Sequence, residues 1–305
     1  PPNRWSPILS IVSFPFRLVY KKMKTLSSSS NSDIIFVEFA DETLAFVSKW
    51  RKNKTIITRL HRYELFKLPN ADWNVVDLVI VVNEWMGKNL ELAVPALKGK
   101  IKCVHNFVNL SHWTRPEVDE RTNALSIVGN IDKRKGHHKA ITAFSKVLEK
   151  KEDLVLNIIG KRTDKQFYEE LQTLVRELNL ENKVNFLGFS QDLKLDFQKS
   201  DIILSFSEHE STHLTLFEGL SCGAWPLSRN WDGVDEFLPS DNIFTNDSDF
   251  VKKVISFYDS PESDTASKLD ELSKEVLPKF SNPDPRQTML DCVSNLYKSG
   301  TKDKE

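Results

Sequence analysis

Two glutamates separated by seven residues stand out among the side chains that could do chemistry. Residues 205–223 read SFSEHESTHLTLFEGLSCG, with Glu210 in a polar turn after a strand pattern and Glu218 in the helical pattern that follows. Both carboxylates can then face one cleft. The turn also offers backbone N–H groups at a helix N-terminus, where phosphates and sugar hydroxyls bind without a cationic side chain. The alternative is an ordinary strand–turn–helix connection with two solvated glutamates.

A basic cluster forms a second candidate site. Residues 128–138 read VGNIDKRKGHH, in which Gly129 ends a strand pattern and three basic residues open a helical one. Cations at a helix N-terminus form an anion site suited to a diphosphate leaving group. An isolated run of charges is more often a solvated surface. The cluster therefore indicates an anion site only in combination with the two glutamates.

Alternating patterns predict the elements that must position these side chains. Short β-branched runs alternate with helical periodicity from residue 33 onward, and continuous apolar strands between helices are typical of parallel sheets covered on both faces. The fold class is therefore α/β, with two Rossmann-like doubly wound domains and ligands bound beyond the carboxyl ends of the strands. Strands are predicted at 33–39, 54–60, 77–83, 100–104, 124–128, 154–159, 183–187, 201–206 and 224–227.

A polar stretch without clear periodicity separates the two predicted domains. Residues 109–123 read NLSHWTRPEVDERTN and include a proline, which is typical of a connection. We predict a partial N-terminal domain at 1–110, a linker at 111–123 and a C-terminal domain at 124–305. The last helix is a candidate for crossing back to the first domain.

Composition excludes several classes of protein. The 305 residues are 40% hydrophobic with a formal net charge of -1, which indicates a globular chain and argues against bulk electrostatic binding to nucleic acid. Three distant cysteines indicate neither a disulfide framework nor a CxxC metal site. The apolar residues 7–20, followed by Lys21, Lys22 and Lys24, are too few to span a membrane. They fit either a peripheral contact with an anionic membrane or ordinary core packing.

The two candidate segments together resemble family 4 glycosyltransferases of the GT-B fold. The family has two glutamates with seven residues between them, which matches Glu210 and Glu218. The family also has a strand followed by a turn with a lysine–glycine pair, and such a turn occurs in this sequence. The likeness runs in order from about residue 33 to residue 257, through LNIIG and VNFLG, and the N-terminal domain is incomplete. The positions that match the turn are Gly129, Asn130, Lys135 and Gly136.

The resemblance implies roles for individual residues. Glu218 would bond the donor ribose, Glu210 the transferred sugar, and Lys135 would neutralise the diphosphate as the glycosidic bond breaks. His61, in TRLHRYE, matches a family histidine that faces donor sugar and acceptor, although it also fits a surface loop. The other positions implied to contact the donor are Gly129, Asn130, Arg134, Gly160, Gly188, Ser211, Thr212, His213, Leu214 and Thr215.

The implied activity is transfer of a hexose-type sugar from a nucleotide-sugar to a hydroxyl, with retention of configuration. The acceptor would be a glycan or a lipid-linked glycan of polysaccharide biosynthesis, in the cytoplasm or at the membrane surface. No metal or cofactor is implied, because basic residues and N–H groups can do the electrostatic work.

The sequence departs from the family pattern at three places. Asn130 stands where the family usually has an arginine, so Arg134 or Lys133 must substitute, or phosphate stabilisation is weaker. Ser211 and His213 replace common glycines, which predicts a bulkier turn. The first strands of the N-terminal domain and their glycine-rich loop are missing from the sequence pattern.

Three rival functions remain open at this point. The chain could be a non-catalytic nucleotide-sugar-binding module or an inactive partner subunit. An epimerase of the same fold would want a closer set of carboxylates than the sequence offers. His209 to His213 spells HESTH, which matches the zinc-protease pattern, but that chemistry needs a helix where the sequence predicts a turn.

Overall fold

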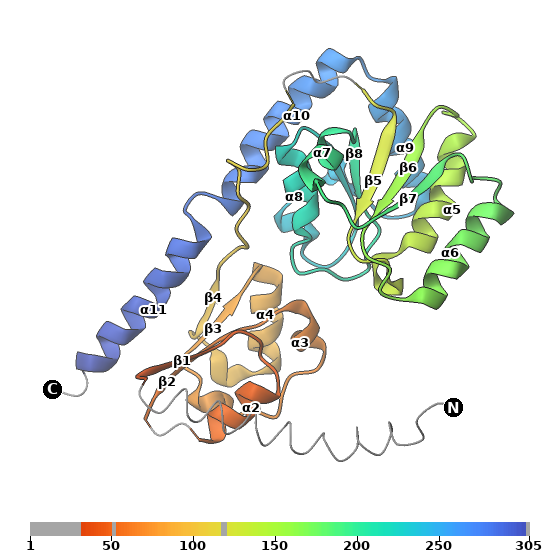
Figure 1. Ribbon diagram of the computed structural model, residues 1–305. Helices are drawn as coiled ribbons and strands as arrows, with labels where there is room; N and C mark the ends of the chain where they lie inside the picture. The colour runs from red at the N-terminus through yellow and green to blue at the C-terminus, as the bar shows by residue number, and fades with distance from the viewer. Residues whose placement is uncertain (1–31, 51–52, 117–120, 303–305) are drawn as a thin grey trace, which may run out of the picture. The chain divides into compact units, whose positions relative to one another are not determined.

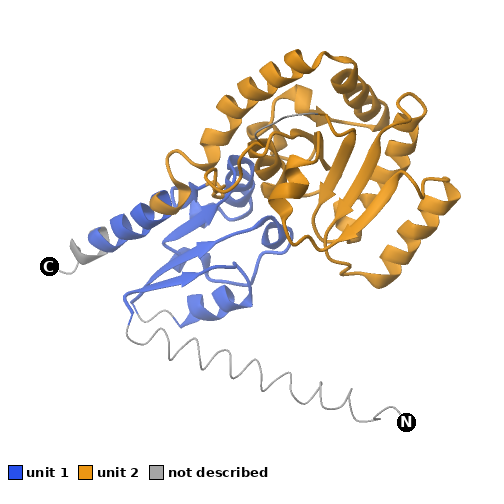
Figure 2. Ribbon diagram, turned by 45° about the horizontal axis from the view of Figure 1, so that its top comes forward, with its two compact units in different colours: residues 1–104, 288–305 blue, residues 105–287 orange. Residues whose placement is uncertain are grey.

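The chain forms two compact units, one of which is discontinuous in sequence. The computed structural model describes residues 32–50, 53–116 and 121–302, and the statements below concern these residues. One unit comprises residues 1–104 with 288–305, and the other residues 105–287 (Figure 2). The polar connection predicted at 111–123 lies inside the second unit, so the chain passes between units earlier than the composition suggested. The N-terminal segment with the lysine cluster falls outside the described residues.

The first unit contains a four-stranded parallel sheet in the order β1-β2-β3-β4 (Figure 1). One face packs on α2 (Glu42–Lys49) and α4 (Glu84–Ala93). The other face, which includes Ile57 and Ile80, packs on α11 (Pro285–Lys302). A short helix, α3 (Arg62–Phe66), follows the second strand. The strands are Ile34–Val37, Thr55–Arg59, Leu78–Val81 and Ile101–Cys103.

The second unit contains a six-stranded parallel sheet in the order β10-β9-β8-β5-β6-β7. In β5 and β8 apolar side chains alternate between the faces, so Ile202 and Leu204 enter one core and Ile203 the other. The strands are β5 (Ala124–Val128), β6 (Val155–Ile159), β7 (Val184–Gly188), β8 (Ile202–Ser205), β9 (Trp225–Arg229) and β10 (Ile243–Phe244).

Helices cover both faces of this second sheet (Figure 1). One core receives apolar residues from α5, α6 and α9, and the other from α7, α8 and α10. The helices are α5 (His137–Leu148), α6 (Lys165–Glu177), α7 (Leu193–Gln198), α8 (Leu214–Ser221), α9 (Asp247–Asp259) and α10 (Glu262–Val276).

Short polar side chains fix where several helices begin. Asp41, Asn83, Asp164 and Asn246 each accept a hydrogen bond from a backbone N–H in the first turn of the following helix. A cap of this kind stabilises a helix by about 1 kcal/mol. Since each cap lies shortly after a strand, it also sets the length of the loop at the edge of the sheet.

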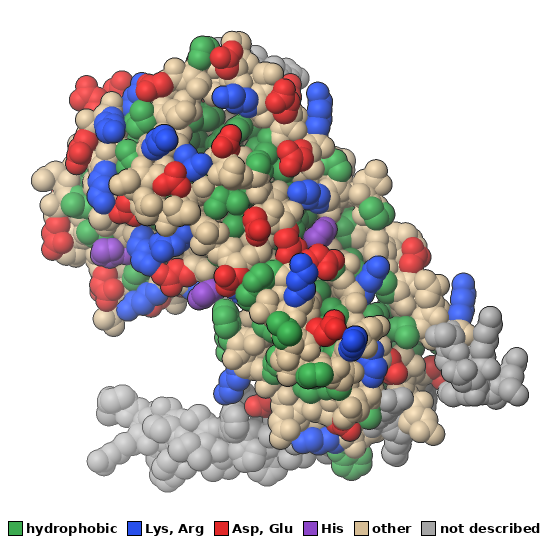
Figure 3. Space-filling view, turned by 180° about the vertical axis from the view of Figure 1, so that it is seen from behind, with side chains coloured by type: hydrophobic (Ala, Val, Ile, Leu, Met, Phe, Trp, Pro, Cys, Tyr) green, Lys and Arg blue, Asp and Glu red, His purple; other side chains and the backbone are tan. Residues whose placement is uncertain are grey.

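The predicted fold class, two doubly wound α/β units with parallel sheets, is confirmed. Each strand predicted from the sequence occurs, and the structure adds β10, whose two residues, Ile243 and Phe244, are too short for a periodic signal. Among the described residues no helix is long and apolar enough to cross a bilayer. Acidic and basic side chains are interspersed over the face that Figure 3 shows.

Candidate functional site

The strand order of the second unit brings the two candidate segments together. The chain runs from β5 to β6 and β7 on one side, then returns to β8 on the other side of β5. In open parallel sheets, ligands bind beyond the carboxyl ends of the strands where the order reverses. The segments after β5 and β8 are those that carry the basic cluster and the first glutamate, so both flank this reversal.

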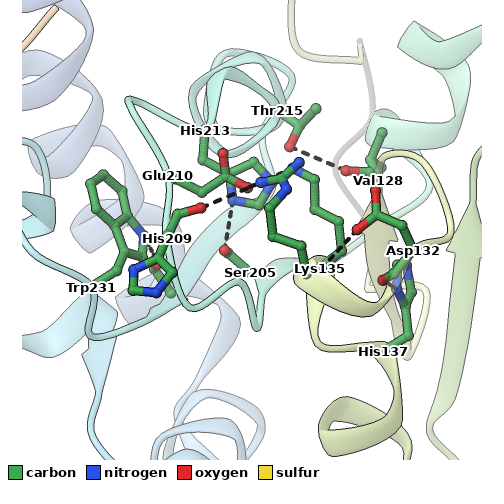
Figure 4. Close-up of polar contacts among 12 residues, drawn as sticks. Val128, Asp132, Lys135, His137, Ser205, His209, Glu210, His213, Thr215 and Trp231 are labelled. Atoms are coloured by element: carbon green, nitrogen blue, oxygen red, sulfur yellow. Dashed lines mark hydrogen bonds and ion pairs between the residues drawn. The ribbon is translucent and has the colours of Figure 1, made fainter. Parts of the chain in front are cut away.

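Glu210 is held by two cations from the other segment. Its Oε1 lies 2.6 Å from Lys135 Nζ and 2.9 Å from Arg134 Nη1 (Figure 4). The Lys135 and Glu210 side chains are each only 12% exposed, so solvent screens their pairing weakly, whereas Arg134 is 51% exposed. Burial raises the pKa of the Glu210 carboxyl, but the charge and hydrogen bond of Lys135, with the charge of Arg134, outweigh burial and hold this pKa below its ordinary value. The site therefore contains an ionised carboxylate and two cations at neutral pH.

The basic residues lie in a tighter turn than the sequence predicted. Lys133–Lys135 form a short 3-10 helix, and α5 begins only after Gly136, which has a left-handed backbone (φ 71°). The prediction that the cluster opens the long helix was wrong, because the left-handed backbone of Gly136 separates the 3-10 helix from α5. Only glycine fits at this position, since a Cβ there would lie 2.3 Å from the Phe206 carbonyl oxygen. This close approach joins the β5 and β8 segments. Lys133 points to Glu170, 3.9 Å away, and takes no part in the cluster.

The three predicted glycines end adjacent strands. Gly129 follows β5, Gly160 follows β6, and Gly188 ends β7. A Cβ at Gly160 would lie 1.8 Å from the Gly129 carbonyl oxygen, so the strand ends approach each other too closely for any side chain. Gly160 N–H donates to the Gly188 carbonyl at 2.7 Å. Exposed backbone is thus available beside Lys135, whose Cε lies 3.3 Å from where a Gly129 Cβ would be.

Helix α8 carries the second glutamate, Glu218. Gly219 allows the helix to pack against β8, since a Cβ there would meet Ile203 Cγ1 at 2.5 Å. Glu218 is half-buried, and burial raises the pKa of its carboxyl to about 7. Among the described residues its carboxylate has no hydrogen-bond or ion-pair partner. The structure therefore places Glu218 in the same strand–turn–helix as Glu210 without linking the two through a shared cation.

Among the remaining predicted residues of the turn, Thr212 is buried and Leu214 and Thr215 are half-buried. Thr212 accepts a hydrogen bond from the Asn106 amide at 2.9 Å, and Thr215 at the start of α8 donates to the Val128 carbonyl at 3.5 Å. Leu214 is the first residue of α8, Ser211 is half-buried, and Asn130 is exposed. These contacts fix the turn against β5 and hold the first N–H groups of α8 beside the strand ends.

His213 is the turn residue that departs most from the predicted pattern. It has a left-handed backbone (φ 56°, ψ 64°) and a buried side chain whose Nδ1 lies 2.6 Å from Ser205 Oγ (Figure 4). Its Nε2 lies 3.5 Å from Lys135 Nζ. Burial first, and the Lys135 charge second, lower the pKa of the imidazole to about 3. The histidine is therefore neutral at physiological pH.

The zinc-protease alternative fails on this geometry. The HESTH run lies before α8, in a loop that ends in a left-handed residue, so its two histidines do not share a helix face. Both ring nitrogens of His213 already contact protein atoms. In the described part of the chain no group of three His, Cys, Asp or Glu residues is arranged to hold a metal ion.

His61 belongs to the first unit and is described there. It precedes α3, where its backbone N–H donates to the Glu64 carboxylate at 2.8 Å. Its ring lies 4.9 Å from the Phe39 ring, and its Nε2 lies 3.7 Å from Glu38 Oε1. The residue lies in the loop between β2 and α3, and its side chain is 26% exposed.

Two residues of the site were not identified from the sequence. Asp132 accepts from the Lys135 backbone N–H at 3.2 Å and fixes the 3-10 turn, and its position three residues before Lys135 is a recognisable cap signal. Ser205 anchors His213 and is a lone polar residue in an apolar strand pattern. His137, the first residue of α5, is fully buried below the basic turn.

Comparisons with known proteins agree with this geometry. The model of the family "Glycosyl transferases group 1" matches residues 114–275. An N-acetylgalactosamine-N,N'-diacetylbacillosaminyl-diphospho-undecaprenol 4-alpha-N-acetylgalactosaminyltransferase of Campylobacter jejuni is 29% identical over 195 residues, 61% of this chain and 48% of the relative. An N-acetyl-alpha-D-glucosaminyl L-malate synthase of Bacillus anthracis is 25% identical over 241 residues, 71% of this chain and 61% of the relative. The chain thus spans 48% and 61% of these two relatives' lengths.

Solved structures share the fold at low sequence identity. Anabaena HepE in complex with UDP and glucose has a TM-score of 0.79 and 16% identity, covering 90% of this chain and 80% of that one. Sucrose-phosphate synthase from Thermosynechococcus elongatus has a TM-score of 0.72 and 16% identity, covering 90% and 76%. At such identities the likeness establishes the α/β architecture and leaves the chemistry to the site residues.

Proposed function

The chain belongs to the family of glycosyl transferases group 1. We therefore propose that it transfers a sugar from a nucleoside diphosphate sugar to a hydroxyl acceptor. The observation that carries the proposal is the sheltered contact of Glu210 with Lys135 and Arg134 at the reversal of strand order. This cluster combines a carboxylate that can accept from sugar hydroxyls with cations suited to a diphosphate.

The leaving diphosphate is the group on which catalysis depends. Negative charge builds on it as the glycosidic bond breaks, and a fixed cation in a sheltered site stabilises that charge without reorganising. Lys135 supplies this cation in the proposal, Arg134 supplements it from the more exposed side, and backbone beside Gly129 leaves room for phosphate oxygens. Arg134 thereby takes the role that the arginine missing at Asn130 would have.

The two glutamates have different roles in the proposal. Ionised Glu210 accepts hydrogen bonds from hydroxyls of the transferred sugar. Glu218, with a pKa near 7, bonds the ribose diol as either donor or acceptor. We further propose a hexose-type sugar, retention of configuration, no bound metal, and a glycan or lipid-linked acceptor reached from the cytoplasmic side. The acceptor part draws support from the diphospho-undecaprenol substrate in the name of the Campylobacter relative.

The test begins with donor identity. Thermal shift against UDP-, GDP- and ADP-sugars selects a donor, and hydrolysis or transfer of that sugar is then measured on the purified chain. Lys135→Ala should lower kcat by about 100-fold with a smaller effect on donor KM, since its charge matters most in the transition state. Glu218→Ala should raise the donor Kd about tenfold, the value of one lost hydrogen bond to a polar group.

A matched control separates the site from general charge loss. Lys133→Ala removes a neighbouring cation that faces Glu170 and lies outside the cluster, so its kcat should stay near that of the unchanged chain. Unchanged kinetics in both Lys135→Ala and Glu218→Ala would contradict the residue roles. Nucleotide binding without turnover would instead favour a binding module.

A further inference from the structure

His213 occupies a strained backbone position that calls for a compensating interaction. It has φ 56°, in the left-handed region that only a few per cent of residues other than glycine adopt. The other non-glycine residues with positive φ in the described chain are asparagines, at 53, 123 and 179. A glycine would relieve the strain, so retaining histidine here indicates that its side chain contributes something specific.

The imidazole lies between an anchor and the Lys135 ammonium. Nδ1 contacts Ser205 Oγ at 2.6 Å, and Ser205 is completely buried in β8. Nε2 contacts Lys135 Nζ at 3.5 Å (Figure 4). The Val128 carbonyl is a further hydrogen-bond partner of the ring. Because an ammonium group only donates, a hydrogen bond from Lys135 requires Nε2 to be the accepting nitrogen, and a neutral ring then carries its proton on Nδ1, where it donates to Ser205.

Lys135 therefore has two fixed acceptors for three N–H groups. Glu210 Oε1 takes one at 2.6 Å and His213 Nε2 takes the second. The third has no acceptor among the described residues. Two contacts at fixed points constrain the direction of the remaining N–H, which a lone ion pair with Glu210 would leave free to rotate.

We propose that His213 is a positioning residue, which accepts from Lys135 and so directs the free N–H of this amine to the leaving diphosphate. The inference rests on the proposed function and adds a residue that acts through Lys135 without touching the donor. It also gives a reason for histidine at a position that favours glycine: the imidazole supplies Lys135 with a second acceptor besides Glu210.

Three substitutions separate positioning from packing. His213→Gly removes the ring and the strain. His213→Asn tolerates the left-handed backbone and places a polar atom where Nδ1 stands, so it keeps the Ser205 contact and loses Lys135. His213→Gln places its terminal amide where Nε2 stands, so it keeps an acceptor for Lys135.

We expect kcat of the glycine and asparagine variants to fall about 10- to 100-fold with donor KM changed less than about threefold, as for a misplaced catalytic group. The glutamine variant should recover most of the lost kcat. A purely structural histidine would give the opposite order, with asparagine active and glutamine impaired, and that result would overturn the inference.

A second measurement needs no turnover. Histidine nitrogens of the full ¹⁵N-labelled chain report the tautomer, and the signal of His213 is the one that disappears in His213→Asn. We expect the Nδ1–H form with no titration between about pH 5 and 8, and a shift toward Nε2–H in Lys135→Met. If the chain transfers sugar but its His213 is protonated on Nε2, the positioning role of His213 is contradicted while the proposed function stands. If the unchanged chain transfers no sugar, the proposed function itself is contradicted.

Discussion

The half-buried carboxyl of Glu218 makes the stability of the second unit depend on pH. Burial raises its pKa from 4.5 to about 7. Between these values the folded chain keeps a proton that the unfolded chain has released, so the free energy of unfolding falls as the pH rises from about 4.5 to about 7. At about 1.36 kcal/mol per pKa unit the full shift is worth about 3 kcal/mol at pH 8, and partial exposure of the side chain reduces this to about 1–2 kcal/mol.

Replacing this carboxyl by an amide should remove the penalty. We expect Glu218→Gln to raise the free energy of unfolding by about 1–2 kcal/mol at pH 8 and by less than about 0.5 kcal/mol at pH 5. Urea denaturation at the two pH values measures both numbers. Glu177→Gln, at the exposed end of α6, controls for the loss of one charge and should show no such difference. An equal gain at both pH values, or none at pH 8, would refute the reasoning.

Three further predictions concern the framework of the site and its metal content. Gly136→Ala should destabilise the chain by about 3 kcal/mol or more, because its Cβ would overlap the Phe206 carbonyl, whereas Gly99→Ala, with a similar φ but open space, should cost about 1 kcal/mol. Thermal or urea unfolding compares the two, and equal losses would contradict the steric argument. Arg121→Met should cost about 2–3 kcal/mol, since its guanidinium bonds three carbonyls at the end of α9, and unchanged stability would count against this. Atomic absorption on the purified chain should find no stoichiometric zinc. One zinc ion per chain would instead support the interpretation of the HESTH run as a zinc-protease motif.

Local patterns predicted most of the architecture. The strands have unbroken β-branched and apolar runs because both faces of each sheet are buried. Such runs predict the strands even when the order in which the strands pair is unknown. The two chemical segments could be placed together as well, because parallel strands put all carboxyl ends at one edge. Strand order then decided which ends are neighbours, and the sequence does not encode that locally.

The details of the site depend on contacts that are distant in sequence. Histidine at position 213 does not by itself predict a left-handed backbone, since only a few per cent of non-glycine residues adopt one. Its placement follows from Ser205, which ends β8, and from Lys135, which lies in the 3-10 turn after β5. The early end of the basic turn likewise follows from the Phe206 carbonyl, which leaves no room for a Cβ at Gly136.

The covering of the first sheet by α11 has a consequence for biosynthesis. Ile57, Ile80 and Val104 pack on Met289, Val293 and Leu296, which the ribosome adds over 180 residues later. During synthesis this apolar face of the first sheet therefore stays uncovered until α11 has been made. Residues 105–287 can form their own hydrophobic core before that point. The first unit would therefore complete its core only after the second unit has been made, which leaves its apolar surface open to aggregation during synthesis.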